Sequence, residues 1–116
     1  MRKILLTIVL IFNIIIMGCS TIRHTRSRST EFGIASWYGS QFANHATASG
    51  ESYLPHLLTA AHPTLPFNTS VKVTNLENNE SVIVRINDRG PFIKGRIIDL
   101  SYEAAKRIHI IDKGIS

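Results

Sequence analysis

The stretch VRINDRGPF at residues 84–92, followed by GRIIDLS at residues 95–101, decides how this sequence folds. A β-branched run leads into a turn that carries Asp88 between Asn87 and Arg89, and a Gly-Pro pair then ends regular structure. A second β-branched run follows at once. The pattern predicts two strands around a rigid turn that presents a carboxylate beside an amide and a cation, an arrangement suited to proton transfer.

Short strands dominate the rest of the chain. Residues 70–76 alternate apolar and polar side chains as a half-buried strand does, and an Asn-rich turn leads back into residues 81–87. Further strands are predicted at residues 33–38 and 95–100, and one short helix at residues 101–110. Such a mainly β domain is expected to form a small closed barrel, because closure removes exposed strand edges.

The amino-terminal segment is typical of an export signal. A positive head precedes the apolar residues 4–17, a run of about 14 residues that suits a secretory signal better than a membrane span of ~20. We expect a signal peptide at residues 1–18, a flexible tether at 19–32 and the folded domain at 33–116.

Cys19 is the only cysteine of the chain and stands where such a signal would be cut. We expect it to receive lipid and to anchor the protein to a membrane. The alternative is an uncleaved anchor, or a simple signal with a chance cysteine, and either alternative also places the domain outside the cytoplasm. Ser20 after Cys19 resembles the sorting pattern of lipoproteins that reach the outer membrane, so in a Gram-negative host the expected location is the periplasmic face of that membrane.

Composition narrows the possible partners. From Ser20 onward, 11 Lys and Arg stand against 8 Asp and Glu, a net charge of +3 that fits an anionic polymer. No basic stripe with interleaved aromatic residues indicates nucleic acid, and no His or Cys spacing indicates a metal. We therefore expect a monomer without metal or cofactor.

Two upstream motifs, ASWYG at residues 35–39 and TAAHPTLP at residues 59–66, join the VRINDRGPF motif in one pattern. From about Gly33 to Ile111 the chain resembles the rare lipoprotein A family of bacterial cell-wall proteins. The resemblance implies a six-stranded double-psi β-barrel with one short helix. In that family a further strand follows the helix, whereas this chain stops at Ser116, so we expect a missing last strand and an open barrel edge.

The resemblance also implies catalytic residues. Asp88 would be the proton-transfer group, Glu51 would face it across a groove, and His62 would orient or protonate either carboxylate. Each has a structural alternative: Asp88 could bind its own turn, Glu51 could be a solvated loop residue, and His62 could be buried against a backbone carbonyl.

Other residues are candidates for substrate binding. Trp37 and Tyr38 are adjacent on a strand, so one could belong to the core while the other stacks on a sugar ring. Arg89 could pair with Asp88 or bind substrate, as could its neighbour Asn87. Asp99 is expected to be structural, as a cap or as a support for the Asp88 turn.

These expectations lead to two functions. The first is a lytic transglycosylase that cleaves the bond between N-acetylmuramic acid and N-acetylglucosamine in peptidoglycan and leaves 1,6-anhydro ends, on strands without stem peptides. The alternative is a non-catalytic glycan-binding or wall-loosening module.

Overall fold

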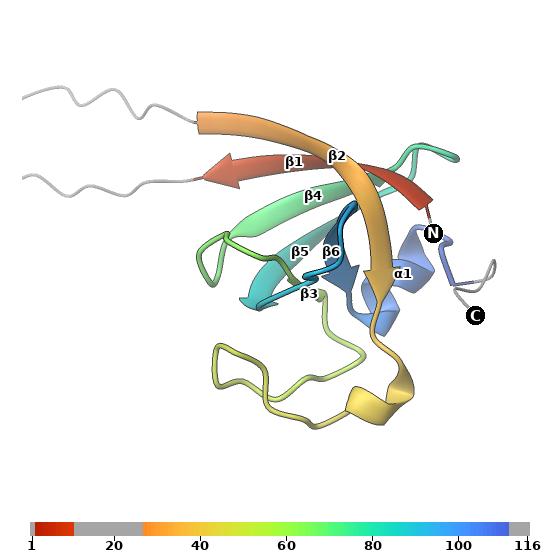
Figure 1. Ribbon diagram of the computed structural model, residues 1–116. Helices are drawn as coiled ribbons and strands as arrows, with labels where there is room; N and C mark the ends of the chain where they lie inside the picture. Colours follow the sequence, from red (N-terminus) through yellow and green to blue (C-terminus); the bar gives the residue numbers. More distant parts are fainter. Residues whose placement is uncertain (1, 11–26, 112–116) are drawn as a thin grey trace, which may run out of the picture.

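The computed structural model describes residues 2–10 and 27–111, and within them six strands close into one barrel in the order β1-β2-β6-β3-β5-β4 (Figure 1). The strands are β1 (Arg2–Leu10), β2 (Ser27–Trp37), β3 (Thr59–Ala61), β4 (Ser70–Asn75), β5 (Ser81–Asp88) and β6 (Arg96–Leu100). A 3-10 helix, η1 (Ser40–Phe42), follows β2, and an α-helix, α1 (Tyr102–Arg107), follows β6. The predicted mainly β fold with one short α-helix is confirmed.

The β4–β5 hairpin follows its sequence pattern. Every second side chain is buried in β4, and in β5 as far as Ile86. The ladder runs from Ser70 opposite Arg85 to Thr74 opposite Ser81. The turn contains Asn79 at a φ of 60°, in the left-handed region that Asn tolerates. This hairpin carries the end of β5, and therefore Asp88, on a rigid support.

Strand β3 joins β5 to β6 in the barrel. It pairs in parallel with β5 and antiparallel with β6, although it has only three residues. So short a strand carries too little alternation to be predicted from sequence. Its pairing brings the chain after Ala61 beside the end of β5, where the His62 amide donates to the Asp88 carbonyl at 3.2 Å.

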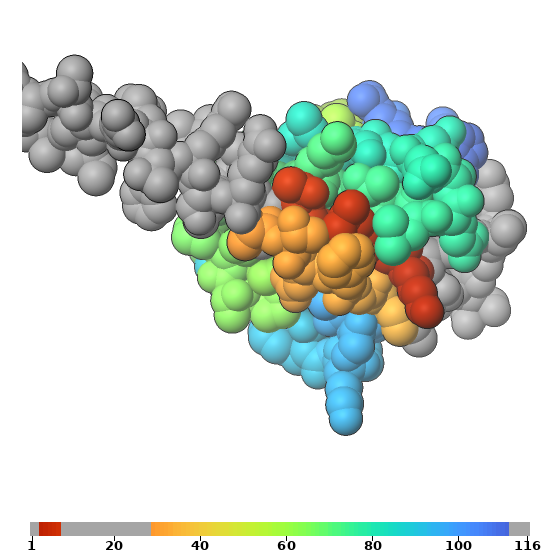
Figure 2. Space-filling view, turned by 90° about the horizontal axis from the view of Figure 1, so that it is seen from above, coloured from red at the N-terminus to blue at the C-terminus, as the bar shows by residue number. Residues whose placement is uncertain are grey.

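Strand β1 differs from the expectation. Residues 2–10 pair antiparallel with β2 on one side and, through Ile4 to Val9, with β4 on the other. Figure 2 shows β1 at the surface between β2 and β4. Ile4 and Leu6 are fully buried in the core, so the apolar run supplies alternate inward side chains, as a barrel strand must.

The expected open barrel edge is therefore wrong, because β1 closes the sheet. In this uncut chain β2 begins at Ser27, within the tether predicted at residues 19–32, and its first residues pair with β1. Sequence composition could not reveal that pairing. The signal peptide stays a prediction, because the structure is that of the uncut chain, and Cys19 lies outside the described residues.

Helix α1 begins where predicted. The Ser101 hydroxyl accepts a hydrogen bond from the Ala104 amide, and Glu103 lies in the first turn. The helix ends at Arg107, earlier than predicted, and His109 adopts a φ of 58° just beyond it. No helix in the described residues is long and apolar enough to cross a membrane.

Candidate active site

Asp88 is held by donors from three separate segments. Its Oδ2 accepts from the Tyr38 hydroxyl at 2.7 Å, and its Oδ1 accepts from the backbone amides of Ala48 at 2.9 Å and Arg89 at 2.8 Å. Only the contact with Arg89 lies within the turn of Asp88 itself, as expected if Asp88 had a structural and not a catalytic role. The other two fix the carboxylate from 50 and 40 residues away along the chain.

The loop before Glu51 is docked onto the end of β5. The Ser49 amide donates to the Asn87 carbonyl at 3.2 Å, and the Thr47 amide donates to the Glu51 carbonyl at 2.7 Å. Between them Gly50 has a φ of 90°, which side chains other than hydrogen rarely permit. The loop thus turns tightly and brings Glu51 to the end of the strand that carries Asp88.

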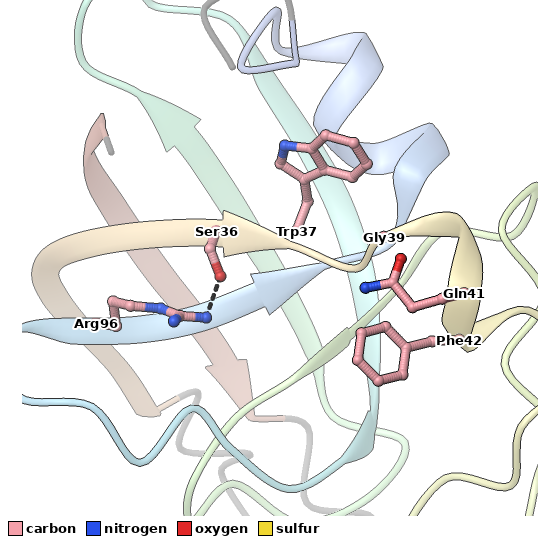
Figure 3. A pocket seen from close by; sticks show the side chains of 6 residues that line it. All are labelled: Ser36, Trp37, Gly39, Gln41, Phe42 and Arg96. Atoms are coloured by element: carbon pink, nitrogen blue, oxygen red, sulfur yellow. Dashed lines mark hydrogen bonds between the residues drawn. The ribbon is translucent and has the colours of Figure 1, made fainter. Parts of the chain in front are cut away.

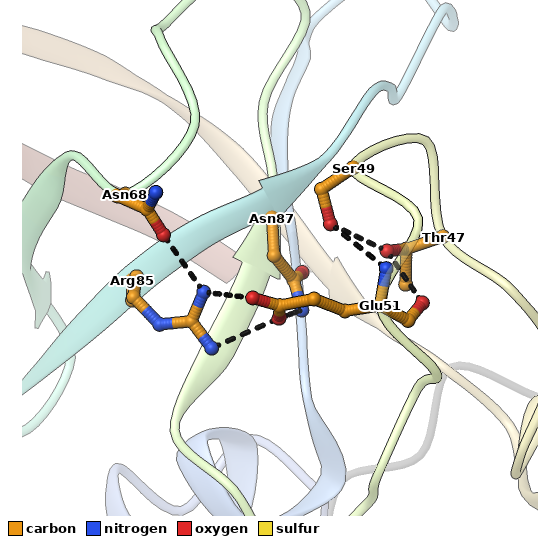
Figure 4. A network of polar contacts seen from close by, with 6 residues as sticks. All are labelled: Thr47, Ser49, Glu51, Asn68, Arg85 and Asn87. Carbon is orange, nitrogen blue, oxygen red and sulfur yellow. Dashed lines mark hydrogen bonds and ion pairs between the residues drawn. The ribbon is translucent and has the colours of Figure 1, made fainter.

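Glu51 is clamped by side chains of β5 (Figure 4). Arg85 binds it with two parallel hydrogen bonds, Nη1 to Oε1 at 2.7 Å and Nη2 to Oε2 at 2.9 Å, and the Asn87 amide nitrogen adds a third at 3.2 Å. Asn68 in turn accepts from Arg85 Nη1 at 3.0 Å. Glu51 is partly exposed, but it is paired rather than simply solvated.

This clamp sets the charge of Glu51. The Arg85 guanidinium, and to a lesser degree the Asn87 amide, hold the pKa of Glu51 below its ordinary value. Glu51 is therefore an anion at neutral pH. Asn87, a candidate for substrate binding, is itself buried and donates to Glu51.

Tyr38 contacts the candidate proton-transfer group directly. Burial raises the pKa of the Tyr38 hydroxyl well above its ordinary value, and the hydrogen bond to Asp88 raises it further. The phenol therefore stays protonated and acts as a donor to Asp88. Its ring packs against those of Tyr53 and Phe42, at centroid distances of 4.8 and 6.0 Å. Sequence reasoning proposed a stacking role for Tyr38 and missed this hydrogen bond.

His62 is buried but lies outside this cluster. Its Nδ1 accepts from the amides of Thr64 and Leu65 at 3.2 and 3.1 Å, which leaves Nε2 to donate to Glu31 at 3.1 Å. Among the contacts of the described residues, none joins its ring to Asp88 or Glu51. Its carboxylate partner, Glu31 on β2, carried no motif and was not predicted.

Arg89 does not pair with the Asp88 carboxylate through its side chain. The guanidinium donates to the Leu65 carbonyl at 2.7 Å and lies 4.0 Å from the centre of the Phe67 ring. These contacts direct the Arg89 side chain toward the segment after β3, which it stabilises. Only the backbone amide of Arg89 binds the Asp88 carboxylate.

Trp37 lines a surface pocket of about 390 Å³ (Figure 3). The other residues around the pocket are Ser36, Gly39, Gln41, Phe42 and Arg96. Arg96 bonds Ser36 and Asp99, so Asp99 supports β2 and β6 rather than the Asp88 turn. The Trp37 ring lies edge-on to Tyr102 at 5.7 Å, and in the described part of the chain its Nε1 has no hydrogen-bond partner.

Comparison with known proteins identifies the family. A family model described as "Lytic transglycolase" matches residues 30–116. The chain is 61% identical over 83 residues to a probable endolytic peptidoglycan transglycosylase RlpA of Synechocystis, which covers 72% of this chain and 26% of that protein.

Two further relatives are endolytic peptidoglycan transglycosylases RlpA. The Vibrio cholerae protein is 56% identical over 85 residues, 73% of this chain and 32% of the relative. The Campylobacter jejuni protein is 59% identical over 85 residues, 73% of this chain and 31% of the relative. The chain thus spans only about a quarter to a third of the length of these relatives. With its six-stranded barrel and the motifs at Trp37, His62 and Asp88, the chain belongs to the rare lipoprotein A family of double-psi β-barrel proteins.

Proposed function

We propose that this chain is a peptidoglycan lytic transglycosylase domain in which Asp88 transfers protons and Glu51 acts as a fixed anion. The observation that carries the proposal is that the end of β5 carries Asp88 and also binds Glu51, and that these two carboxylates have different partners. Asp88 is bound by a phenol and two amides, whereas Glu51 is bound by a guanidinium. Glycan cleavage uses such a division of roles between two carboxyl groups. The names of the relatives agree with this activity.

The reaction would proceed without added water. Protonated Asp88 gives its proton to the glycosidic oxygen as the bond from C1 of N-acetylmuramic acid to that oxygen breaks. The resulting Asp88 carboxylate then takes the proton from the 6-hydroxyl of the same sugar, and that oxygen bonds to C1 to form the 1,6-anhydro ring. Protons balance, because Asp88 ends as it began. Both transfers require the carboxyl to stay in one place, which its three donors ensure.

Glu51 would stabilise the positive charge that develops at C1 as the bond breaks. An anion held in position before the reaction needs no reorganisation during it. Arg85 and Asn87 supply that positioning through the bidentate ion pair and the amide contact. His62 would support the site indirectly, through the backbone bond between its amide and Asp88.

We propose the following setting for the domain. Its substrate would be glycan strands without stem peptides, contacted in part by Trp37 at the surface pocket. The protein would be a monomer anchored by lipid on Cys19 to the periplasmic face of the outer membrane. Replacing Cys19 by Ala would then abolish lipid labelling and membrane attachment.

One observation favours a non-catalytic glycan-binding module instead. Both oxygens of Glu51 are engaged by Arg85 and Asn87, as in a structural ion pair. In that case the pocket beside Trp37 would hold a glycan strand without cleaving it.

Purified glycan strands incubated with the protein distinguish these functions. Anhydromuramoyl ends in the mass spectrum support the transglycosylase, reducing ends indicate a hydrolase, and bound but intact strands indicate a binding module. Asp88→Asn should lower the rate by about 10²–10⁴-fold, because general acid–base groups contribute on that order. Its side chain can still accept from the amides and donate to Tyr38, so the fold should persist.

Glu103→Gln is the matched control for Asp88→Asn. Glu103 lies on α1 and pairs with Arg107. Among the described residues no hydrogen bond or ion pair joins its side chain to Asp88 or Glu51, so its loss should leave turnover unchanged. Equal turnover of the Asp88→Asn and native proteins would refute the assignment of Asp88.

A further inference from the structure

One strand position of the barrel is filled from the amino terminus of the chain. β1 lies between β2 and β4 and forms a backbone ladder with each of them. β2 is otherwise bonded to β6, and β4 to β5. Without β1, the sheet would therefore be open, with one free edge on β2 and one on β4, and these edges would face each other across a gap one strand wide.

The gap has defined requirements for its occupant. The ladder with β4 spans Ile4 to Val9, so a strand of about six residues fills it, antiparallel to both neighbours. Ile4 and Leu6 are fully buried in the core cluster that also contains Val71 and Val73 of β4. Lys3 is exposed, and Thr7 is half-buried. The gap thus selects an extended segment with apolar side chains at alternate positions.

Residues 2–10 are also part of the predicted export signal. A signal bound by export machinery cannot at the same time pair with β2 and β4. The two states of this segment exclude each other, and removing it would leave the core side chains beneath it in contact with water.

We propose that the gap between β2 and β4 is an exchangeable strand-binding site, occupied by residues 2–10 in the uncut chain. When the covalent link is cut, the site keeps this strand by non-covalent pairing and exchanges it for an added peptide of the same pattern. The ligand is an extended apolar-alternating peptide, recognised by its backbone on both edges and by two inward side chains. The site goes beyond the proposed function and requires no glycan chemistry.

A cut chain tests the proposal. Specific protease sites are placed after Leu10 and before Cys19 in the full chain, which folds before it is cut, so that residues 11–18 are excised. Native mass spectrometry should then show residues 1–10 still bound to the body of the protein. A fluorescent peptide of residues 2–10 should enter the site as the resident strand leaves, and should be displaced by unlabelled peptide.

Two peptide variants make the test specific. Leu6→Asp places a charge in the core and should abolish binding of the labelled peptide, whereas Thr7→Asp points outward and should bind within a few-fold of the native peptide. Immediate loss of residues 1–10 on cutting, or equal binding of the two variant peptides, would overturn the proposal.

A cross-link checks the resident strand in the uncut chain. Thr7 is opposite Lys72 of β4, and Lys72 is opposite Ile83 of β5. In a Cys19→Ser background, the cysteine pair at 7 and 72 should form a disulfide, because directly opposed residues lie within bonding range. The pair at 7 and 83, two strands apart, should not. Equal disulfide formation in both pairs, or none at 7 and 72, would show that residues 2–10 do not occupy the gap.

Discussion

At the residue scale, the candidate site depends on partners that a motif does not contain. Glu51 belongs to a recognisable loop, but the residue that keeps it charged, Arg85, lies on β5. Arg85 and Asn87 are two positions apart and share one face of their strand, so the period of a strand already places them together. That both face Glu51 follows only from the docking of the loop onto the end of β5.

The Arg85 clamp leads to a pH prediction. Replacing Arg85 by Met removes the main cause that lowers the pKa of Glu51, so Glu51 should take up a proton at a higher pH. The low-pH limb of kcat/KM should therefore move to higher pH, and kcat should fall as the anion loses its position. Arg85→Lys keeps the positive charge but not the two parallel bonds, so it should move the low-pH limb less far than Arg85→Met does.

The control for this experiment is Arg107→Met, which breaks the exposed Arg107–Glu103 pair on α1. It should leave the pH profile unchanged. An unshifted profile in Arg85→Met would mean that Glu51 does not govern the low-pH limb.

At the element scale, the sequence predicted those strands and helices that follow from the local pattern of side chains alone. The β4–β5 hairpin follows from alternation and an Asn-rich turn, and α1 from its cap at Ser101. β3 is too short to show a period, and the strand character of residues 2–10 was hidden by their likeness to an export signal. In both cases the strand exists because two neighbours flank it, which is information from tertiary structure.

The helix cap can be tested by stability. Ser101→Ala removes the acceptor for the buried Ala104 amide and should lower the free energy of unfolding by about 1 kcal/mol. Urea denaturation measures this change. Ser70→Ala, at an exposed position in β4, should change stability by less than about 0.5 kcal/mol. Equal stability of the Ser101→Ala and native proteins would show that the cap is dispensable.

At the scale of the whole molecule, closure of the barrel links segments that are distant in the sequence. β1 pairs with β4, from Val9 opposite Ser70 to Ile4 opposite Asn75, and β2 pairs in parallel with β6. Loop-closure entropy must be overcome before such contacts stabilise the fold, so barrels of this kind fold slowly.

We therefore expect refolding in milliseconds to seconds rather than microseconds. Stopped-flow fluorescence of Trp37, the only tryptophan, reports this step, because its ring packs against Tyr102 of α1 only once β2 and the helix have met. A microsecond signal that accounts for the full amplitude would contradict the expectation.

The three donors to Asp88 have a further consequence, for the level of the protein in the cell. Because the end of β2, the loop at Ala48 and the turn at Arg89 all bind this one carboxylate, replacing it by a side chain without polar atoms leaves donors unpaired and loosens three segments together. Destabilised chains are removed by proteases, so a loss of one or two kcal/mol can change abundance several-fold. Mutational drift at Asp88 would therefore reduce the amount of protein, and copies without this carboxylate would be scarce rather than accumulate.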